Sequence, residues 1–304
     1  MKRPHRLIFT LCTAIICVAI LFPDTAVAQQ AYSPTLQQLR SPRASQGAKV
    51  TQMVGLSDVT IYFHRPGVKG RTIFGTKESG ALQPYSEVWR AGANEPTLFS
   101  FSHDVTIAGK KLTAGMYRFV AIPGEQEWTL VFNSEVKNWG TVYDQKFDTL
   151  RFTVKPETIP PVEWMSFFFT DLMPNSATVV LVWEKVRVAF KVEFDLLLLM
   201  QAQVGRWQEL SAAARYAVDN NLYLKEAMGW ADRSIALNKN WNNLRTKAEL
   251  LAIEGKLQEA IATAEEGLKI VKATDMSRMN AVQRQAVTNT ERLVSEWKMK
   301  AGSK

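Results

Sequence analysis

The period of the apolar pattern changes once along this chain, after Phe194, and that change limits the folds available to it. Up to Phe194, short runs of strand-forming residues are separated by turn residues, and no helical pattern intervenes. These runs predict an antiparallel β-sandwich, jelly-roll-like in topology, over residues 48–194. The runs are Val50–Met53, Val59–Phe63, Leu98–Phe101, Val105–Ile107, Tyr117–Ala121, Trp128–Phe132, Leu150–Val154, Met165–Phe169, Thr178–Trp183 and Val186–Phe194.

A helical period follows and predicts an α-helical domain over residues 195–304. Asp195 occupies the position of an N-cap. Leu196–Met200 is continuously apolar, a composition that does not suit a hydrated linker. We therefore expect the first helix to pack on the sandwich and the two domains to move as one body.

Two segments of the helical domain repeat each other. Gly255–Ile261 looks like the turn and second-helix start of a tetratricopeptide repeat, and Leu224–Ala227 matches Leu257–Ala260 at an offset of 33 residues. Trp207 and Trp241 recur at an offset of 34, so the two registers disagree by one residue and the repeats are degenerate. Generic helical hairpins are the alternative. Because an independent solenoid needs about three repeats, we expect the last helix, the sandwich, or a protein or peptide partner to cover the apolar faces.

The first residues have the order of an export signal. Lys2, Arg3 and Arg6 precede an apolar run, Leu7–Phe22, and the small residues Ala26–Ala28 follow it. This order predicts a signal peptide of residues 1–28 and a periplasmic or secreted protein. A membrane anchor is the competing interpretation, but the run is short for a span of roughly 20 residues, so no transmembrane span is expected after cleavage. Residues 29–47, rich in Gln, Ser, Pro and Ala, are predicted to form a flexible leader.

Cysteine content and charge exclude several classes of protein. Cys12 and Cys17 both lie in the predicted signal peptide, so the mature chain has no thiol for a disulfide or for cysteine catalysis. The formal net charge of the full chain is +8, and the basic residues are spread along it. Nucleic-acid binding needs basic residues gathered on one face, so no nucleic-acid partner is expected.

No complete catalytic or metal motif is present. His64 and His103, the histidines of the mature chain, could join Asp104 or Glu95 in a metal site, but no ligand spacing supports one. Ser134–Lys137 matches the Ser-x-x-Lys pattern of acyl-transferring enzymes without its companion elements. We expect neither a metal nor a cofactor. Paired carboxylates for glycoside hydrolysis stay open, so the sequence favours a binding protein over an enzyme without deciding between them.

The strongest candidate site lies in two glycine-rich basic turns, Arg65–Arg71 and Trp89–Glu95. Guanidinium groups bind carboxylates and aromatic faces cover sugars, so these turns suit an anionic or glycan ligand. The candidate ligand-binding residues are His64, Arg65, Lys69, Arg71, Trp89, Arg90, Asn94 and Glu95, with Tyr62, Phe74 and Tyr85 as further aromatic walls. The alternative is structural: arginines beside glycine turns often form ion pairs that lock loops, here Arg90 with Glu95 or Glu87.

The same two turns, together with Ile73–Gly75, Ala114–Tyr117 and Ile122–Gly124, resemble the bacterial domain of unknown function 2911 family over Ser41–Phe194. Two positions depart from that pattern: Pro96 stands where Ala is more typical, and His64 where a small polar residue is common. The resemblance implies an exported bacterial protein, and because the family has no assigned activity it implies no residue role.

Together these observations predict an exported envelope protein that binds a ligand or assembles with other proteins. A hydrolase acting on envelope glycans or peptides is the alternative.

Overall fold

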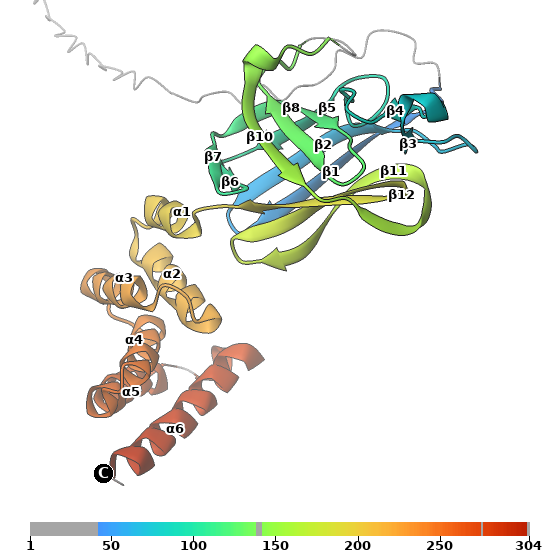
Figure 1. Cartoon of the computed structure of the whole chain (residues 1–304). Helices are drawn as coiled ribbons and strands as arrows, with labels where there is room; N and C mark the ends of the chain where they lie inside the picture. The colour runs from blue at the N-terminus through green and yellow to red at the C-terminus, as the bar shows by residue number, and fades with distance from the viewer. Residues whose placement is uncertain (1–41, 138–141, 275, 303–304) are drawn as a thin grey trace, which may run out of the picture. The chain divides into compact units, whose positions relative to one another are not determined.

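The computed structural model describes residues 42–137, 142–274 and 276–302, so the predicted signal peptide and most of the predicted leader lie outside the described residues. The described chain begins with antiparallel β-sheets and continues into six α-helices (Figure 1). The predicted order of a β region followed by a helical region is therefore confirmed.

The first sheet has six antiparallel strands in the order β1-β2-β5-β8-β9-β10. Its strands are β1 (Gln46–Val54), β2 (Ser57–Arg65), β5 (Thr97–Phe101), β8 (Gly115–Ile122), β9 (Trp128–Asn133) and β10 (Asp148–Val154). The second sheet has four strands in the order β11-β12-β6-β7. They are β11 (Glu157–Met173), β12 (Ser176–Glu193), β6 (Val105–Ile107) and β7 (Lys110–Leu112), and a short parallel pair, β3 (Phe74–Gly75) and β4 (Gln83–Pro84), lies between β2 and β5 in sequence.

Aromatic side chains form the core between the two sheets. Phe63 of β2 meets Phe167 of β11 edge to face, with ring centroids 5.1 Å apart, and Phe119 of β8 stacks on Phe190 of β12 at 5.8 Å. Successive residues of a strand point to opposite faces, so only every second residue reaches this core. The alternation seen in the sequence thus follows from burial of one face of each sheet.

The predicted runs Thr178–Trp183 and Val186–Phe194 form one strand, β12, instead of two. Glu184 has φ of +54°, and the pairing of β12 with β11 shifts register beside it. Before the irregularity the core side chains of β12 have odd residue numbers, and after it they have even numbers. A β-bulge causes such a shift, because it adds one residue to one strand of the pair. The sequence showed this change of phase, but a bulge and a turn produce the same interruption.

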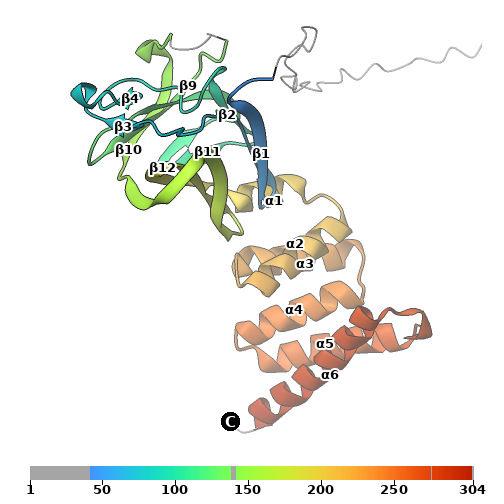
Figure 2. The same ribbon diagram turned by 90° about the vertical axis from the view of Figure 1, so that its right-hand side faces the viewer.

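Six helices follow β12: α1 (Leu196–Gln203), α2 (Trp207–Asn220), α3 (Leu224–Leu237), α4 (Trp241–Ile253), α5 (Leu257–Lys272) and α6 (Ala281–Gly302), seen from a second side in Figure 2. Asp195 caps α1 as predicted, because its Oδ1 accepts a hydrogen bond from the Leu198 amide at 3.0 Å. Leu196 and Met200 join a core with residues of α2 and α3, and Leu199 packs against the sandwich core. That the two regions move as one body stays a prediction. In the part of the chain described here, no helix is both long and apolar enough to cross a membrane.

The disagreement between the two repeat offsets has a structural origin. Trp207 and Trp241 open α2 and α4, and Leu224 and Leu257 open α3 and α5. Helix α2 has 14 residues and α4 has 13, so one residue is missing from the first helix of the second hairpin. Apolar residues of α6, including Val287 and Trp297, complete the core of the second hairpin.

Candidate functional site

The residues predicted to form one ligand cleft divide into two groups in the structure. The division begins at His64 and Arg65, which are neighbours near the end of β2. Successive side chains of a strand point to opposite faces. His64 Nε2 lies 3.0 Å from Glu95 Oε2. Arg65 instead reaches β11, where its Nε donates to the Met165 carbonyl oxygen at 2.9 Å and its Nη2 to Ser166 Oγ at 2.6 Å.

The group near β11 consists of Arg65, Lys69 and Arg71. Arg71 donates to the carbonyl oxygens of Gly67 and Val68, at 2.6 and 3.0 Å, and so closes its own turn. The Lys69 amide donates to Glu163 Oε1 at 3.0 Å, while the Lys69 residue is exposed. Both guanidinium groups are therefore used in holding the turn on the sheet.

A glycine lies in close contact with two side chains where this turn meets β11. A Cβ atom at Gly67 would lie 2.8 Å from Glu163 Oε1 and 3.1 Å from the Trp164 ring. Gly67 pairs with Trp164 in an isolated antiparallel bridge. The glycine of this signature turn thus has a packing role.

The second group joins the loop before β5 to the segment before β1. Arg43 donates to both oxygens of Glu95, at 2.6 and 2.8 Å, and Asn94 Nδ2 donates to the Ser45 carbonyl oxygen at 2.9 Å. His64 contacts the same carboxylate, through Glu95 Oε2. These contacts fit the structural interpretation of the turns, with Arg43 as the partner that the sequence did not suggest.

The two titratable groups of this contact have shifted pKa values. Burial is the largest influence on His64 and lowers its pKa below 6.5; Glu95 opposes this shift, while Arg43 and Arg90 add to it. Burial by itself would raise the pKa of Glu95, but its own backbone amide, Arg43 and His64 together lower it below 4.5. At neutral pH the contact therefore joins an ionised carboxylate to a neutral imidazole.

Trp89 belongs to the sandwich core and forms no cleft wall. It is 3% exposed, stacks on Trp183 with ring centroids 5.6 Å apart, and donates from Nε1 to the Gly92 carbonyl oxygen at 3.2 Å. Phe74, also predicted as a wall, packs edge to face on Trp89 at 5.6 Å. The expectation of an aromatic-lined cleft at Trp89 and Phe74 is not met.

Arg90 forms no ion pair with Glu95 or Glu87 in the described part of the chain, since Glu95 is held by Arg43 and His64. The proposed lock between Arg90 and one of these carboxylates is therefore wrong. Arg90 is half-buried and lies close enough to His64 and Arg118 to lower the pKa of both. Burial lowers the pKa of Arg118 more than Arg90 does.

The other chemical motifs have local partners. Ser134 Oγ donates to the Phe147 carbonyl oxygen at 3.2 Å, and the Lys137 amide donates to Glu135. His103 Nδ1 lies 3.1 Å from Ser102 Oγ. Across the described ranges, no three histidine, cysteine or acidic side chains form a group that could hold a metal ion.

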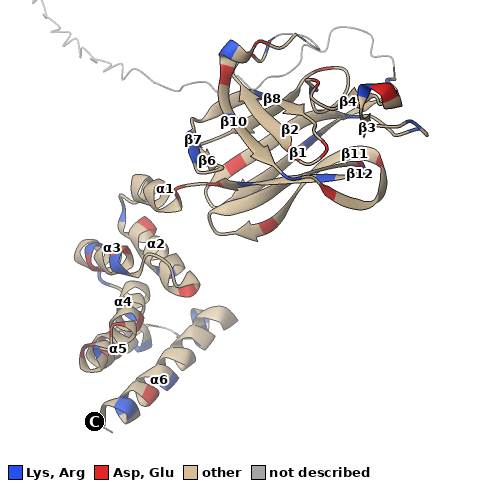
Figure 3. Ribbon diagram, viewed as in Figure 1, with Lys and Arg blue, Asp and Glu red and all other residues tan. Residues whose placement is uncertain are grey.

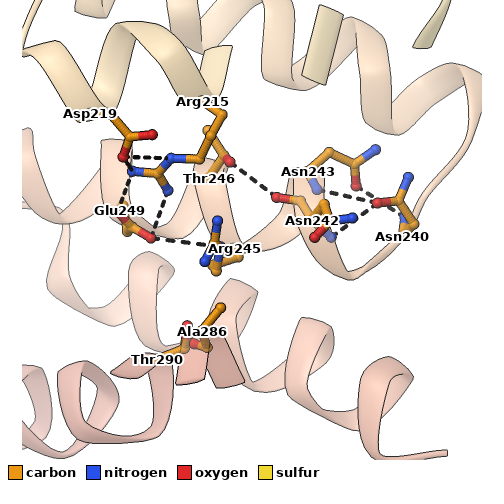
Figure 4. Close-up of polar contacts among 10 residues, drawn as sticks. All are labelled: Arg215, Asp219, Asn240, Asn242, Asn243, Arg245, Thr246, Glu249, Ala286 and Thr290. Atoms are coloured by element: carbon orange, nitrogen blue, oxygen red, sulfur yellow. Dashed lines mark hydrogen bonds and ion pairs between the residues drawn. The ribbon is translucent and has the colours of Figure 1, made fainter. Parts of the chain in front are cut away.

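A polar cluster that the sequence analysis missed lies in the helical region (Figure 4). Arg215 of α2 donates to both oxygens of Glu249 on α4, at 2.9 Å each, and also to Asp219 Oδ1 at 2.6 and 2.9 Å. Arg215 and Glu249 are separated by the same offset as Trp207 and Trp241, so they hold equivalent positions in successive hairpins. A charged pair at the repeat offset was the sequence signal for this cluster.

Arg245, one turn before Glu249, resembles Arg90 and differs from Arg65, Arg71 and Arg215, because no described residue accepts a hydrogen bond from it. Its side chain is 21% exposed, its Nε lies 4.0 Å from Glu249 Oε1, and none of its nitrogens donates a hydrogen bond to a described residue. Its guanidinium lies 6.0 Å from the centre of the Trp241 ring. Burial lowers the pKa of Arg245, and the neighbouring Arg215 adds to that effect.

Two shallow hollows, both open to solvent, lie in the helical region. One, of about 510 Å³, lies between α4 and α6 and is lined by Arg245, Ala281, Val282, Gln285, Ala286 and Asn289. The other, of about 350 Å³, lies between α5 and α6 and is lined by Glu265, Leu268, Lys269, Lys272, Glu291 and Val294. Neither includes a residue of the predicted turns.

Comparison with known proteins covers the sandwich. Residues 45–192 match the family model described as Protein of unknown function (DUF2911). This match supports the family that the two turns and their flanking motifs suggested. No curated protein and no solved structure matches the chain.

Proposed function

We propose that this protein is an exported bacterial envelope protein that binds a segment of another protein, or a peptide, on its helical region. The observation that carries the proposal is the hollow between α4 and α6. This hollow is shallow and open to solvent, and its volume of about 510 Å³ leaves room for a segment that lies along the surface.

The lining of this hollow suits an extended peptide. Val282 is 78% exposed and offers an apolar surface, while the amides of Gln285 and Asn289 can both donate and accept hydrogen bonds. A few polar groups within an otherwise small and apolar lining is the usual composition of a recognition site. Helix α4 of the second hairpin and helix α6, which packs on that hairpin, both contribute lining residues.

The sandwich has less support as a ligand site. Arg65, Arg71 and Glu95 are occupied by contacts within the fold, which leaves Lys69 and Arg90 as the predicted cations without a described partner. We infer that the sandwich has a structural role. Binding of an anionic or glycan ligand at its turns is the less favoured proposal.

The hydrolase alternative also has less support. A glycosidase needs a general acid whose pKa is raised. Glu95, the carboxylate at the centre of the predicted site, has a lowered pKa. Asp148, another carboxylate of the sandwich, accepts hydrogen bonds from Asn133, Tyr143 and Arg151.

A blocking substitution tests the proposed binding surface. Ala286→Phe fills the hollow from α6, and Thr288→Phe places the same ring on an exposed position of the same helix that does not line it. Both proteins and the unchanged chain are applied to an array of acetylated decapeptides drawn from bacterial envelope proteins. We expect a set of peptides to bind the unchanged chain and the Thr288→Phe variant and to be lost with Ala286→Phe. The same peptides bound equally by all three proteins would refute the proposal.

Export is tested separately by the intact mass of the protein recovered from the cell envelope. Cleavage after Ala28 predicts a chain that begins at Gln29. A mass that includes residues 1–28 contradicts it.

A further inference from the structure

Arg245 places a positively charged group at the hollow between α4 and α6, and no described residue accepts a hydrogen bond from it. A guanidinium carries five N–H donors in a planar fork. Its Nε is a buried atom without a hydrogen-bond partner. No described residue accepts from its two Nη groups either, and these are the donors that a ligand in the hollow can reach, because Nε itself is buried.

The neighbouring acidic groups do not supply that acceptor. Both oxygens of Glu249 accept from Arg215, and the distance of 4.0 Å from Glu249 Oε1 to Arg245 Nε is too long for a hydrogen bond. Asp219 is also taken by Arg215. The hydrogen bonds of both acids therefore go to Arg215, and Glu249 forms only a long ion pair with Arg245, drawn as a dashed line in Figure 4.

The remaining lining of the hollow carries no charge. Ala281, Val282, Gln285, Ala286 and Asn289 are all uncharged, so Arg245 is the single charged group among the lining residues. The hollow between α5 and α6 provides the contrast, because its lining contains two lysines and two glutamates, and Lys272 Nζ lies 2.6 Å from Glu291 Oε1. Only the hollow at Arg245 has a charge without a counterpart in its lining.

The hollow also has room for more than an ordered water. A site needs roughly 15 Å³ to hold one water molecule, and this hollow measures about 510 Å³. Trp241 flanks the guanidinium and limits the directions from which an acceptor can approach. A polyatomic acceptor fits these dimensions better than a single ion.

We propose that Arg245 binds a carboxylate of the peptide segment that occupies the hollow between α4 and α6, an inference that rests on the proposed function. The match is chemical: a carboxylate accepts two parallel N–H bonds from a guanidinium and neutralises its charge. The carboxylate belongs either to an acidic side chain or to a peptide C-terminus, and the experiment separates these sources.

Three peptides of one sequence, chosen from those that bind the array, test the inference by titration calorimetry with the full chain. The first has a central Glu and an amidated C-terminus, the second replaces Glu by Gln, and the third has Gln and a free C-terminal carboxylate. We expect the first or the third to bind about ten- to hundredfold more tightly than the second, the range for one charge-assisted hydrogen-bonded contact. The peptide that gains affinity identifies the source of the carboxylate.

Variants of Arg245 assign the preference to this side chain. Arg245→Gln should abolish the preference, and Arg245→Lys, which keeps the charge but loses the fork, should retain a smaller one. Arg233→Gln, an exposed arginine of α3, is the matched control and should change nothing. Thermal melting of each variant confirms that it is folded.

The outcomes separate this inference from the proposed function. If all three peptides bind alike, and Ala286→Phe still abolishes binding, the hollow is a peptide site but the carboxylate inference is wrong. If Arg245→Lys and Arg245→Gln both fold and keep the full preference, Arg245 is a solvated guanidinium and another residue binds the carboxylate. If Ala286→Phe changes no binding, the proposed function itself fails.

Discussion

Arg65 in the sandwich and Arg245 in the helical region show opposite uses of the same side chain. Arg65 lies in a glycine-rich turn that the sequence marks as a site, yet its guanidinium holds β2 against β11 through Met165 and Ser166. Arg245 lies in a helix that no motif marks, yet none of its nitrogens has an acceptor among the described residues. The hydrogen bonds of Arg65 are satisfied by the fold, whereas Arg245 keeps donors that no described residue uses.

The difference shows that a distinctive sequence around an arginine does not indicate what the arginine binds. Irregular turns need donors to satisfy their carbonyl oxygens, because backbone groups buried without partners destabilise the fold. An arginine that meets this need is constrained by the fold itself. A functional arginine is better recognised by donors that the fold leaves unused.

The largest expected effect is the loss of stability on substitution of Trp89, a residue of the predicted site that lies in the sandwich core. Trp89→Ala removes a ring that is 3% exposed and stacks on Trp183, so it should lower the free energy of unfolding by about 3–5 kcal/mol. Trp164→Ala, at a tryptophan that is 43% exposed, is the control and should cost clearly less. Chemical denaturation measures both. Equal losses would mean that Trp89 has no special place in the core.

Periodicity predicted most of the fold because burial of one face imposes it on every strand and helix. The alternating runs became strands, and the Asp195 cap and the offsets near 34 marked the helices and hairpins. The short strands β3 and β4 escaped prediction because two-residue elements carry no period. Strand β12 was divided in two because the shift beside Glu184 interrupts the alternation as a turn would.

The candidate site was harder to predict because it depends on contacts between distant segments. That His64 and Arg65 face opposite ways follows from strand alternation and could have been anticipated. The partner of Arg65 could not, since Met165 lies 100 positions along the chain. The isolation of Arg245 depends on where α6 packs, and nothing in the sequence of α4 reports that position.

A second prediction measures what Arg65 contributes. Arg65→Met keeps much of the side-chain volume but removes the donors to Met165 and Ser166, which should cost about 1–3 kcal/mol of unfolding free energy because a buried carbonyl oxygen loses its partner. Arg71→Met, in the same turn but exposed, should cost less. An Arg65→Met protein as stable as the unchanged chain would reopen the ligand interpretation of the turn.

The third prediction is that removing the Arg245 guanidinium, unlike removing that of Arg65, does not destabilise the protein. Arg245→Met removes a guanidinium that has no acceptor, so we expect the free energy of unfolding to stay unchanged or to rise by about 1 kcal/mol, in contrast to Arg65→Met. Denaturant titrations of the two variants under one condition make the comparison. A loss for Arg245→Met as large as that for Arg65→Met would show that both arginines are structural and would remove the contrast between the two regions.

The smallest effect concerns Arg90, which approaches cationic neighbours instead of a carboxylate. Arg90→Ala should change the unfolding free energy at neutral pH by no more than about 0.5 kcal/mol, as for a substitution that breaks no described contact. Because Arg90 lowers the pKa of His64, its removal should raise that pKa, which an NMR titration of the imidazole measures directly.

The pKa of His64 in the folded chain lies below the 6.5 of the unfolded chain, so the unfolded state takes up its proton first as the pH falls. Stability should therefore be complete above pH 6.5 and decline as the pH falls from there through the folded pKa, and Arg90→Ala should make that decline smaller. A loss of several kcal/mol, with the pKa of His64 unchanged, would mean that Arg90 has a carboxylate partner in solution and is as structural as Arg65.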